Sequence, residues 1–421
     1  MQAFLAALLT LATAHAGNVI FIHPDGAGVA SWQAARFFLV GPDGDLNWDR
    51  LPYVAVYRGH NADNLTSTSN GGATIHAYGV KAPRAGFGSD GQSAAPLVSA
   101  GGEKMSLMQE ALKKGIRCGL VNSGSIIEPG SAAFVASVKQ RKDFEEIARQ
   151  VIQSGVDVIL SGGEEWLLPE GTKGRHTASG KRTDKMNLIE WAKENGYTVV
   201  YDNAELAAVP PTTRRLLGVF AAANTFNDME TQALDAAGLP TYQEGAPTFG
   251  EMVSKALELL GNDHFFLVAE EEGTDNFGNY NNARGVLDAL RRADAGFGAA
   301  LDFLKKNPDT LIVTAADSEA GSMDVIGISS SPAELAMLAQ GRDVNGAPYD
   351  TYEPGKPIMS APDKDGNRHP FVISWGSKND VSGGIVTRAA GKGAEGLGGT
   401  CDNTRIYSLM RDVLFEKPRG R

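Results

Sequence analysis

The sequence predicts an α/β fold in which a mainly parallel central sheet carries helices on both faces. Three observations support this prediction. Short, continuously apolar runs alternate with helical patterns through most of the chain. Such runs are typical of strands that are buried on both sides. Acidic residues directly follow several of the runs, at the edge where sheets of this kind bind their ligands.

Seven apolar runs are expected to form strands of the sheet, and the apolar residues at 371–375 are expected to form a further one. The seven runs cover residues 18–23, 117–123, 157–163, 198–202, 216–221, 265–270 and 310–317. Amphipathic stretches at 104–115, 142–155 and 289–307 have the period of helices. Residues 323–367 are rich in Gly, Pro, Ser and Asp, and we expect an irregular insertion there, between the last two core strands and in a position to form a lid over the site.

The first sixteen residues, "MQAFLAALLTLATAHA", contain no charged side chain and are too short to span a bilayer. The sequence "AHA" before Gly17 has the form of a cleavage site, so residues 1–16 are interpreted as a signal peptide and residues 17–421 as one domain. The alternative is a buried N-terminal helix. No later segment reaches membrane-spanning length, so we expect a secreted or periplasmic protein without a membrane span.

The 421-residue chain contains 50 acidic and 39 basic residues, which gives a formal charge of −11. This balance argues against nucleic-acid recognition and against binding to anionic membranes. The two cysteines, Cys118 and Cys401, lie far apart and form no metal-binding motif, which excludes a thiolate zinc site. A long-range disulfide and two buried thiols both remain open.

Carboxylates follow four separate predicted strands. Asp25 follows the first, Glu270 and Asp275 follow the run at 265–270, Asp317 ends the run at 310–317, and Asp380 follows the apolar residues at 371–375. One such Asp is commonly a helix cap or a turn residue. Five carboxylates that converge from four strands would repel one another, however, so the pattern predicts a site for cations.

The order of these segments resembles the alkaline phosphatase family along most of the chain. The segment "HPDGAG" contains Asp25, "TSTSNGGATIHAYGVK" places Ser69 at the position of the nucleophile, and "GLVNSGSIIEPGSAAFVASVKQR" leads to Arg141. Further matches are the long segment that begins "ILSGGEEWLLPEGTKGRHTASG", "NPDTLIVTAADSEAG" and "GGTCDNTRIYSLM". The resemblance implies that Ser69 attacks phosphorus, that Arg141 binds phosphate oxygens, and that the amide of Asn70 lies beside the phosphate.

The family's three zinc-binding histidines are replaced here by residues that carry oxygen, namely Asn279, Ser318 and Asp380. Gly130 also stands in place of a hydroxyl residue, two positions after the loop residue Glu128. The metal ligands that the resemblance implies are Asp25, Ser69, Glu128, Glu270, Asp275, Asn279, Asp317, Ser318 and Asp380. Since oxygen ligands suit hard cations, we expect two or three divalent ions, with calcium or magnesium favoured over zinc.

Two other histidines, His23 and His76, are candidates to replace the missing imidazoles. His76 lies seven residues after Ser69 on one helix, roughly 10 Å along its axis, which is too far. His23 shares a strand face with Asp25 and is able to reach the site, although a packed or hydrogen-bonded role is favoured.

The sequence thus indicates an exported, metal-dependent phosphomonoesterase that acts on a phosphorylated small molecule through a phosphoserine intermediate. The alternative is a non-catalytic descendant that binds phosphate or a cation, because three metal ligands have changed. No Cys/Ser-x-Pro-x-Arg motif appears, which argues against the related sulfatases. A homodimer remains open as the state of assembly.

Overall fold

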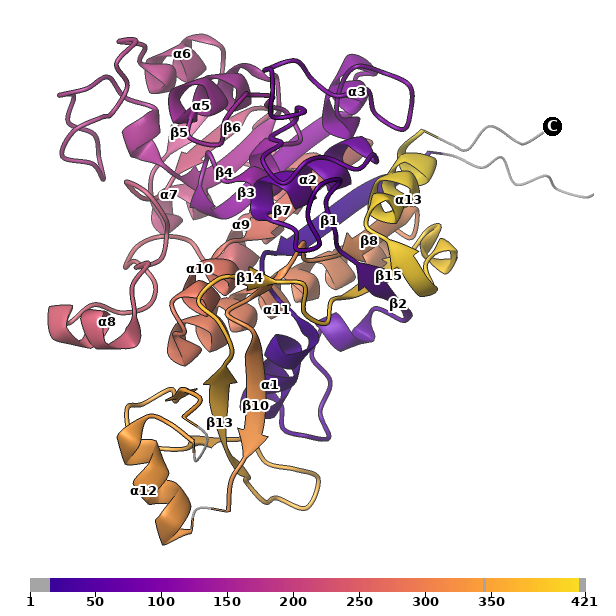
Figure 1. The fold of residues 1–421 in the computed structure, drawn as a ribbon. Helices are drawn as coiled ribbons and strands as arrows, with labels where there is room; N and C mark the ends of the chain where they lie inside the picture. The colour runs from indigo at the N-terminus through magenta and orange to yellow at the C-terminus, as the bar shows by residue number, and fades with distance from the viewer. Residues whose placement is uncertain (1–15, 330, 344–345, 416–421) are drawn as a thin grey trace, which may run out of the picture.

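A ten-stranded sheet lies at the centre of the protein in the computed structural model, which describes residues 16–329, 331–343 and 346–415 (Figure 1). The strands follow the order β16-β2-β15-β8-β1-β7-β3-β4-β6-β5. Their bounds are β1 Asn18–Pro24, β2 Tyr53–Arg58, β3 Arg117–Ser125, β4 Val158–Gly162, β5 Thr198–Val200, β6 Leu216–Val219, β7 Phe265–Glu271, β8 Thr310–Thr314, β15 Val386–Gly391 and β16 Gly399–Asp402.

The sheet is mainly parallel, as predicted. The seven strands from β8 to β5 pair in parallel, and they are the seven that the apolar runs indicate. β15 runs antiparallel to both β8 and β2, and β16 pairs in parallel with β2 at the edge. These three strands were not predicted. β2 alternates between exposed and buried residues, so it lacks a continuous apolar run.

Helices cover both faces of the sheet. The bounds are α1 Val29–Leu39, α2 Ser69–Tyr78, α3 Leu107–Lys113, α4 Pro129–Ala132, α5 Phe144–Gln153, α6 Leu188–Glu194, α7 Asn203–Ala208, α8 Thr231–Ala237, α9 Phe249–Leu260, α10 Gly273–Asn279, α11 Ala283–Lys306, α12 Pro332–Gln340 and α13 Thr404–Leu414. Side chains of α2, α3, α5, α6 and α13 belong to one buried cluster, and those of α1, α9 and α11 belong to the other.

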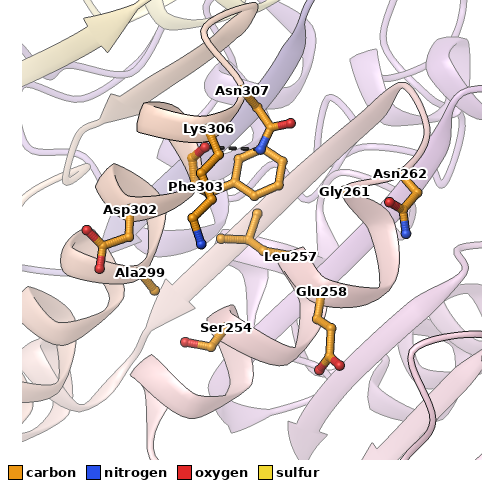
Figure 2. Close-up of a pocket in the computed structure, with 10 residues that line it drawn as sticks. All are labelled: Ser254, Leu257, Glu258, Gly261, Asn262, Ala299, Asp302, Phe303, Lys306 and Asn307. Carbon is orange, nitrogen blue, oxygen red and sulfur yellow. Dashed lines mark hydrogen bonds between the residues drawn. The ribbon is translucent and has the colours of Figure 1, made fainter.

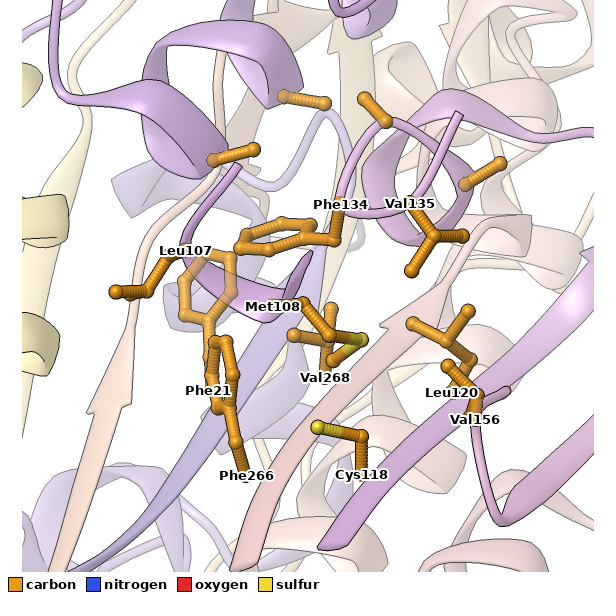
Figure 3. Close-up of a cluster of buried hydrophobic side chains, with 14 of the residues drawn as sticks. Phe21, Leu107, Met108, Cys118, Leu120, Phe134, Val135, Val156, Phe266 and Val268 are labelled. Atoms are coloured by element: carbon orange, nitrogen blue, oxygen red, sulfur yellow. The ribbon is translucent and has the colours of Figure 1, made fainter. Parts of the chain in front are cut away.

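Strand β1 shows why the sheet needs both layers. Its alternating residues enter opposite clusters, with Val19 and Phe21 on one face and Ile20 and Ile22 on the other. Figure 3 shows part of the first cluster, in which the Phe134 ring packs against those of Phe21 and Phe266 at centroid distances of 6.0 and 5.9 Å. Aromatic pairs at this separation stabilise a core beyond the area they bury. The cluster therefore supports β1, the strand that Asp25 follows.

A second, smaller sheet is present that the sequence did not predict. It contains β10 (Met323–Gly327), β11 (Tyr349–Asp350), β12 (Ile358–Met359) and β13 (Pro370–Trp375), and it lies beside α12 (Figure 1). β13 was expected in the central sheet, but it pairs antiparallel with β10, so the segment between them is not wholly irregular. The apolar run at 371–375 indicates a buried strand, but it does not indicate which sheet that strand joins.

Two other interpretations of the sequence concern the signal peptide and the two cysteines. The signal-peptide interpretation falls almost entirely on residues 1–15, which lie outside the described ranges. Among the described residues, no helix is both long and apolar enough to cross a membrane. Cys118 and Cys401 are both buried free thiols, and Cys118 lies in the cluster of Figure 3. The structure therefore favours two buried thiols over a disulfide.

Candidate metal and phosphate site

The carboxyl ends of three adjacent central strands bring acidic side chains together. Asp25 follows β1, Glu270 lies at the end of β7 with Asp275 shortly after it in α10, and Asp317 follows β8. All four residues are buried. Three of these carboxylates, those of Glu270, Asp275 and Asp317, have pKa values that the negative charge of Asp25 helps to raise. The convergence expected from the strand exits is thus present in the structure.

Asp380 reaches this group by a different route from the predicted one. A two-stranded ribbon pairs β14 (Asp380–Val381) with β9 (Glu319–Ala320); β9 precedes the small sheet in the chain and β14 follows it. The side-chain amide of Asn279 donates to both oxygens of Asp275 at 3.2 Å and to Asp380 Oδ1 at 3.0 Å. Ser318 Oγ lies 3.4 Å from Asp317 Oδ1. The three residues that replace the family's histidines therefore lie beside the acidic residues.

Ser69 is the first residue of α2 and is almost fully buried, at 6% exposure. It lies close enough to Asp25 to help lower the pKa of that carboxyl. The side-chain amide of Asn70 donates to the carbonyls of Arg84 and Gly86, at 2.9 and 3.2 Å, and so anchors the start of the helix. The first N–H groups of a helix have no acceptor within it, which makes this end suitable for an anion.

The approach of α2 to the carboxylates depends on Gly72. A Cβ atom at this position would lie 2.3 Å from the Cβ of Asp317 and 2.8 Å from Ser67 Oγ. Since such distances are shorter than any van der Waals contact, a larger residue would displace the helix start. The glycine thus allows the first turn of α2, which begins with Ser69, to lie against Asp317.

Arg141 and Glu128 form an ion pair in which Arg141 donates to Glu128 Oε2 at 2.6 Å. Glu128 precedes α4, and its side chain is 14% exposed, whereas that of Arg141 is 40% exposed. Burial raises the pKa of Glu128, Arg141 lowers it, and Asp25 raises it further. Glu128 therefore contacts Arg141, the residue predicted to bind phosphate. It also lies close enough to the acidic group for the charge of Asp25 to raise its pKa.

Two further residues belong to the site. Glu272 is buried, and the charges of Glu128, Glu270, Asp25 and Asp275 raise its pKa well above the ordinary value in addition to the effect of burial. It is the third acidic residue of "EEEGTD", and the run of three acidic residues was the signal for it. His23 Nε2 lies 3.3 Å from Asp25 Oδ1. The strand alternation placed His23 on the face of Asp25, and the favoured interpretation was a packed or hydrogen-bonded histidine; His23 Nδ1 does lie 2.7 Å from the carbonyl oxygen of Ala315.

His76 does not join the acidic group. Its Nε2 lies 2.7 Å from the hydroxyl of Tyr57, and its ring packs against Phe21 and His23. Burial and the neighbouring His23 lower its pKa well below the ordinary value, so it stays neutral. This placement agrees with the expectation that His76 is not a metal ligand.

The acidic group requires compensating positive charge. Seven carboxylates lie in it, namely Asp25, Glu128, Glu270, Glu272, Asp275, Asp317 and Asp380. Burial, with the other carboxylates, raises the pKa of Glu270 to about 7 and that of Asp317 well above its ordinary range. Burial opposes the shift at Asp25, but close contacts with Asp317, His23 and Ser69 lower its pKa. In the absence of cations, several of these groups would hold protons at neutral pH.

The ligand atoms themselves fit divalent cations. Within this group, buried atoms of six residues have no hydrogen-bond partner among the described residues: His23 Nε2, Asp25 Oδ1 and Oδ2, Glu270 Oε1, Glu272 Oε2, Asn279 Oδ1 and Asp317 Oδ2. Two sets offer ligand atoms within 4.8 Å of one another, His23 with Asp25 and Glu270, and Asp25 with Glu272 and Asp275. Buried polar atoms without partners are costly, and a bound cation would satisfy them.

A pocket of about 440 Å³ lies elsewhere, between α9 and α11 (Figure 2). Leu257, Phe303 and Lys306 are among its lining residues. The two helices end there, just before β7 and β8 begin, so the pocket lies at the amino edge of the sheet. The acidic group lies at the opposite, carboxyl edge, and the pocket is therefore separate from the candidate site.

Comparisons with known proteins agree with this geometry. Residues 16–414 match the family model described as alkaline phosphatase. An alkaline phosphatase of Gadus morhua is 28% identical over 350 residues, which are 74% of this chain and 70% of that protein.

Solved structures show the same fold. The alkaline phosphatase of Thermus thermophilus superposes with a TM-score of 0.72 at 21% identity, over 99% of this chain and 96% of that one. A variant of the alkaline phosphatase from the Antarctic bacterium TAB5, with magnesium bound in its M3 site, gives a TM-score of 0.69 at 20% identity, over 96% and 99% of the two chains.

Proposed function

Because this chain belongs to the alkaline phosphatase family of phosphoric monoester hydrolases, we propose that it is an exported, metal-dependent phosphomonoesterase that works through a phosphoserine at Ser69. The observation that carries the proposal is the position of Ser69. It lies at the start of α2, buried beside Asp25, at the carboxyl edge where the other acidic residues converge. A serine that only capped a helix would have no need of this surrounding charge.

Different residues of the chain act as the nucleophile, bind the phosphate and bind the cations. Ser69 Oγ attacks phosphorus and forms the phosphoseryl group, and the leaving oxygen departs on the opposite side. The N–H groups at the start of α2, including that of Asn70, attract the phosphate oxygens. Arg141 donates to Glu128 through one nitrogen, and its partly exposed fork offers further N–H donors to two non-bridging oxygens.

The cation ligands would come from three groups of residues. Asp25, Ser69, Asp317 and Ser318 lie around the start of α2, and Asp275, Asn279 and Asp380 lie beside the ribbon. Glu270, with Glu128 nearby, completes the set. When bound, divalent cations would lower the pKa of the Ser69 hydroxyl, neutralise the leaving oxygen and activate the water that hydrolyses the phosphoserine.

We infer that the positions lined by Asp, Asn and Ser take calcium or magnesium in preference to zinc. Asn279, Ser318 and Asp380 offer only oxygen as metal ligands, and hard cations prefer oxygen. Asn279 supports this inference directly, because its Oδ1 is buried and without a hydrogen-bond partner while its Nδ2 is fixed by Asp275 and Asp380.

The test is hydrolysis of nitrophenyl phosphate by protein that has been stripped with a chelator and reloaded with single metals. We expect calcium or magnesium to restore more turnover than zinc, and mass spectrometry of acid-quenched enzyme to show phosphate on the peptide that contains Ser69. Binding of inorganic phosphate without turnover in any metal would instead indicate the non-catalytic alternative. A phosphorylated peptide other than that of Ser69 would contradict the assignment of the nucleophile.

A further inference from the structure

The feature that suggests a second kind of metal site is the pairing of His23 with Glu270. The parallel register of β1 and β7 places these two residues opposite each other. Asp25 follows two residues after His23, and all three side chains are completely buried. Their ligand atoms lie within 4.8 Å of one another.

The hydrogen bonding of His23 determines which nitrogen is free. Nδ1 lies 2.7 Å from the carbonyl oxygen of Ala315, which only accepts hydrogen bonds, so Nδ1 carries a hydrogen. In the neutral imidazole, Nε2 then presents a lone pair. This atom is buried, has no hydrogen-bond partner in the described part of the chain, and lies 3.3 Å from Asp25 Oδ1. Metal-binding histidines are commonly held in this way, by a carbonyl on the other nitrogen.

Glu270 is oriented in the same manner. Its Oε2 accepts hydrogen bonds from the backbone N–H of Ser131, at 2.7 Å, and from the side chain of Asn122. Its Oε1 is buried without a partner, as are both oxygens of Asp25. His23 and Glu270 are therefore each fixed by the protein through one polar atom, while the other atom is buried without a partner near the two free oxygens of Asp25.

Gly130 provides the space for this arrangement. A Cβ atom there would lie 1.9 Å from Glu270 Oε1 and 2.6 Å from Cδ2 of His23. A hydroxyl residue, which the family resemblance leads us to expect at this position, therefore does not fit beside these two side chains. The ring of His23 and the carboxylate of Glu270 fill the volume that such a residue would occupy.

We propose that His23, Asp25 and Glu270 form a cation site in which His23 Nε2 is a direct ligand, and that this site selects zinc, manganese or cobalt. An imidazole with two carboxylates suits such transition metals, whereas calcium and magnesium prefer oxygen alone. The two carboxylates balance the charge of one divalent ion, and the neutral imidazole adds none. The chain would then hold hard cations at the positions that lost histidines and a softer cation at the position that gained one.

A proton is the competing occupant of this site. Burial lowers the pKa of His23, but Asp25 and Glu270 outweigh burial and raise it. An imidazolium would then donate from Nε2 to Asp25, and no metal would be needed between them. The experiment must therefore distinguish a metal at Nε2 from a hydrogen at Nε2.

The test compares wild-type protein with His23→Asn, because the Asn amide can still donate to Ala315 while nothing replaces Nε2. Full-length protein is stripped with a chelator, incubated with excess calcium and a small excess of zinc, passed through a desalting column, and analysed for both metals. We expect His23→Asn to lose one equivalent of zinc, or to bind it at least tenfold more weakly, with its calcium content unchanged. His176→Asn, at an exposed histidine, is the matched control and should bind both metals as wild type does.

Anomalous diffraction at the zinc edge from wild-type crystals keeps the test decisive if the variant does not fold. A zinc peak at coordination distance from Nε2, about 2.0–2.1 Å, supports the proposal. Equal zinc content in wild type and His23→Asn, or a peak that lacks Nε2 as a ligand, overturns it. So does a nitrogen-15 spectrum that shows a hydrogen on Nε2 in the presence of zinc.

This inference concerns the proposed metal-dependent function, but it is tested by metal binding alone. Zinc at His23 in a protein without turnover would overturn the proposed function and leave this site intact. Turnover with calcium or magnesium, but without zinc at His23, would support the proposed function and overturn this site.

Discussion

Replacing Glu270 by Gln is expected to have opposite effects on stability with and without cations. In chelated protein, burial and the carboxylates of Asp25 and Glu128 raise the pKa of Glu270 from 4.5 to about 7. An acid with a raised native pKa binds more protons when folded than when unfolded. Its contribution to stability is therefore complete below about pH 4.5 and is lost as the pH rises through about 7.

The size of this effect follows from the two pKa values. Each tenfold change in proton affinity corresponds to about 1.4 kcal/mol, so ionising Glu270 in the folded, chelated protein costs roughly 3 kcal/mol. Gln keeps the oxygen that accepts from Ser131 and cannot ionise. At pH 8 in chelator, Glu270→Gln should thus be more stable than wild type by up to about 3 kcal/mol, and at pH 5 by less than about 1 kcal/mol.

With saturating cations, wild type should instead be more stable than Glu270→Gln. A cation at one hundred times its dissociation constant adds about 2.7 kcal/mol of stability per site. The variant loses a charged ligand and should gain less, so with cations at pH 8 it becomes less stable than wild type. Urea unfolding at pH 5 and 8, with chelator and with cations, measures all four values, and Glu194→Gln at an exposed position is the control. A variant that is no more stable than wild type in chelator at pH 8 would refute the reasoning.

Three further predictions concern the catalytic groups. Ser69→Ala should lose turnover and keep an unfolding midpoint close to that of wild type, and a wild-type kcat would exclude Ser69 as the nucleophile. Arg141→Lys should raise the inhibition constant of inorganic phosphate by about tenfold or more, because a point charge cannot reproduce a bidentate contact; unchanged inhibition would remove Arg141 from the site. Changing Asn279, Ser318 and Asp380 together to His should raise the ratio of zinc-supported to calcium-supported turnover, and a constant ratio would argue against these positions as metal ligands.

The part of the site that follows parallel strands is predictable from sequence. Asp25, Glu270 and Asp317 come directly after apolar runs, and parallel strands end at the same edge of the sheet. Asp380 was expected there too, but the route was wrong, because β13 joins the small sheet and the β9–β14 ribbon brings Asp380 to the edge. The sequence indicates where a strand ends, and tertiary pairing determines which sheet it joins.

His23 illustrates a different limit. Alternation along β1 shows that it shares a face with Asp25, but its partner Glu270 lies 247 residues away in the chain. The register between two such distant strands is set by the packing of both sheet faces and is not visible in either segment. The hydrogen bond to Ala315 and the space beside Gly130 also come from residues that are remote in sequence. The sequence therefore identifies His23 as a candidate metal ligand, but the contacts that support this role are visible only in the folded structure.

The pairing of β10 with β13 has a consequence for how this protein can diversify. Met323 faces Trp375 and Gly327 faces Phe371, so the chain enters and leaves the small sheet at adjacent points. Whatever lies beyond Gly327 begins and ends at this stem, and Ser318 and Asp380 lie on the near side of it. Insertions and deletions at the far end can thus change the shape of the small sheet while the two segments that carry Ser318 and Asp380 keep their positions. The stem separates a part of the molecule that is free to vary in length from a part in which a displacement of one ångström would matter.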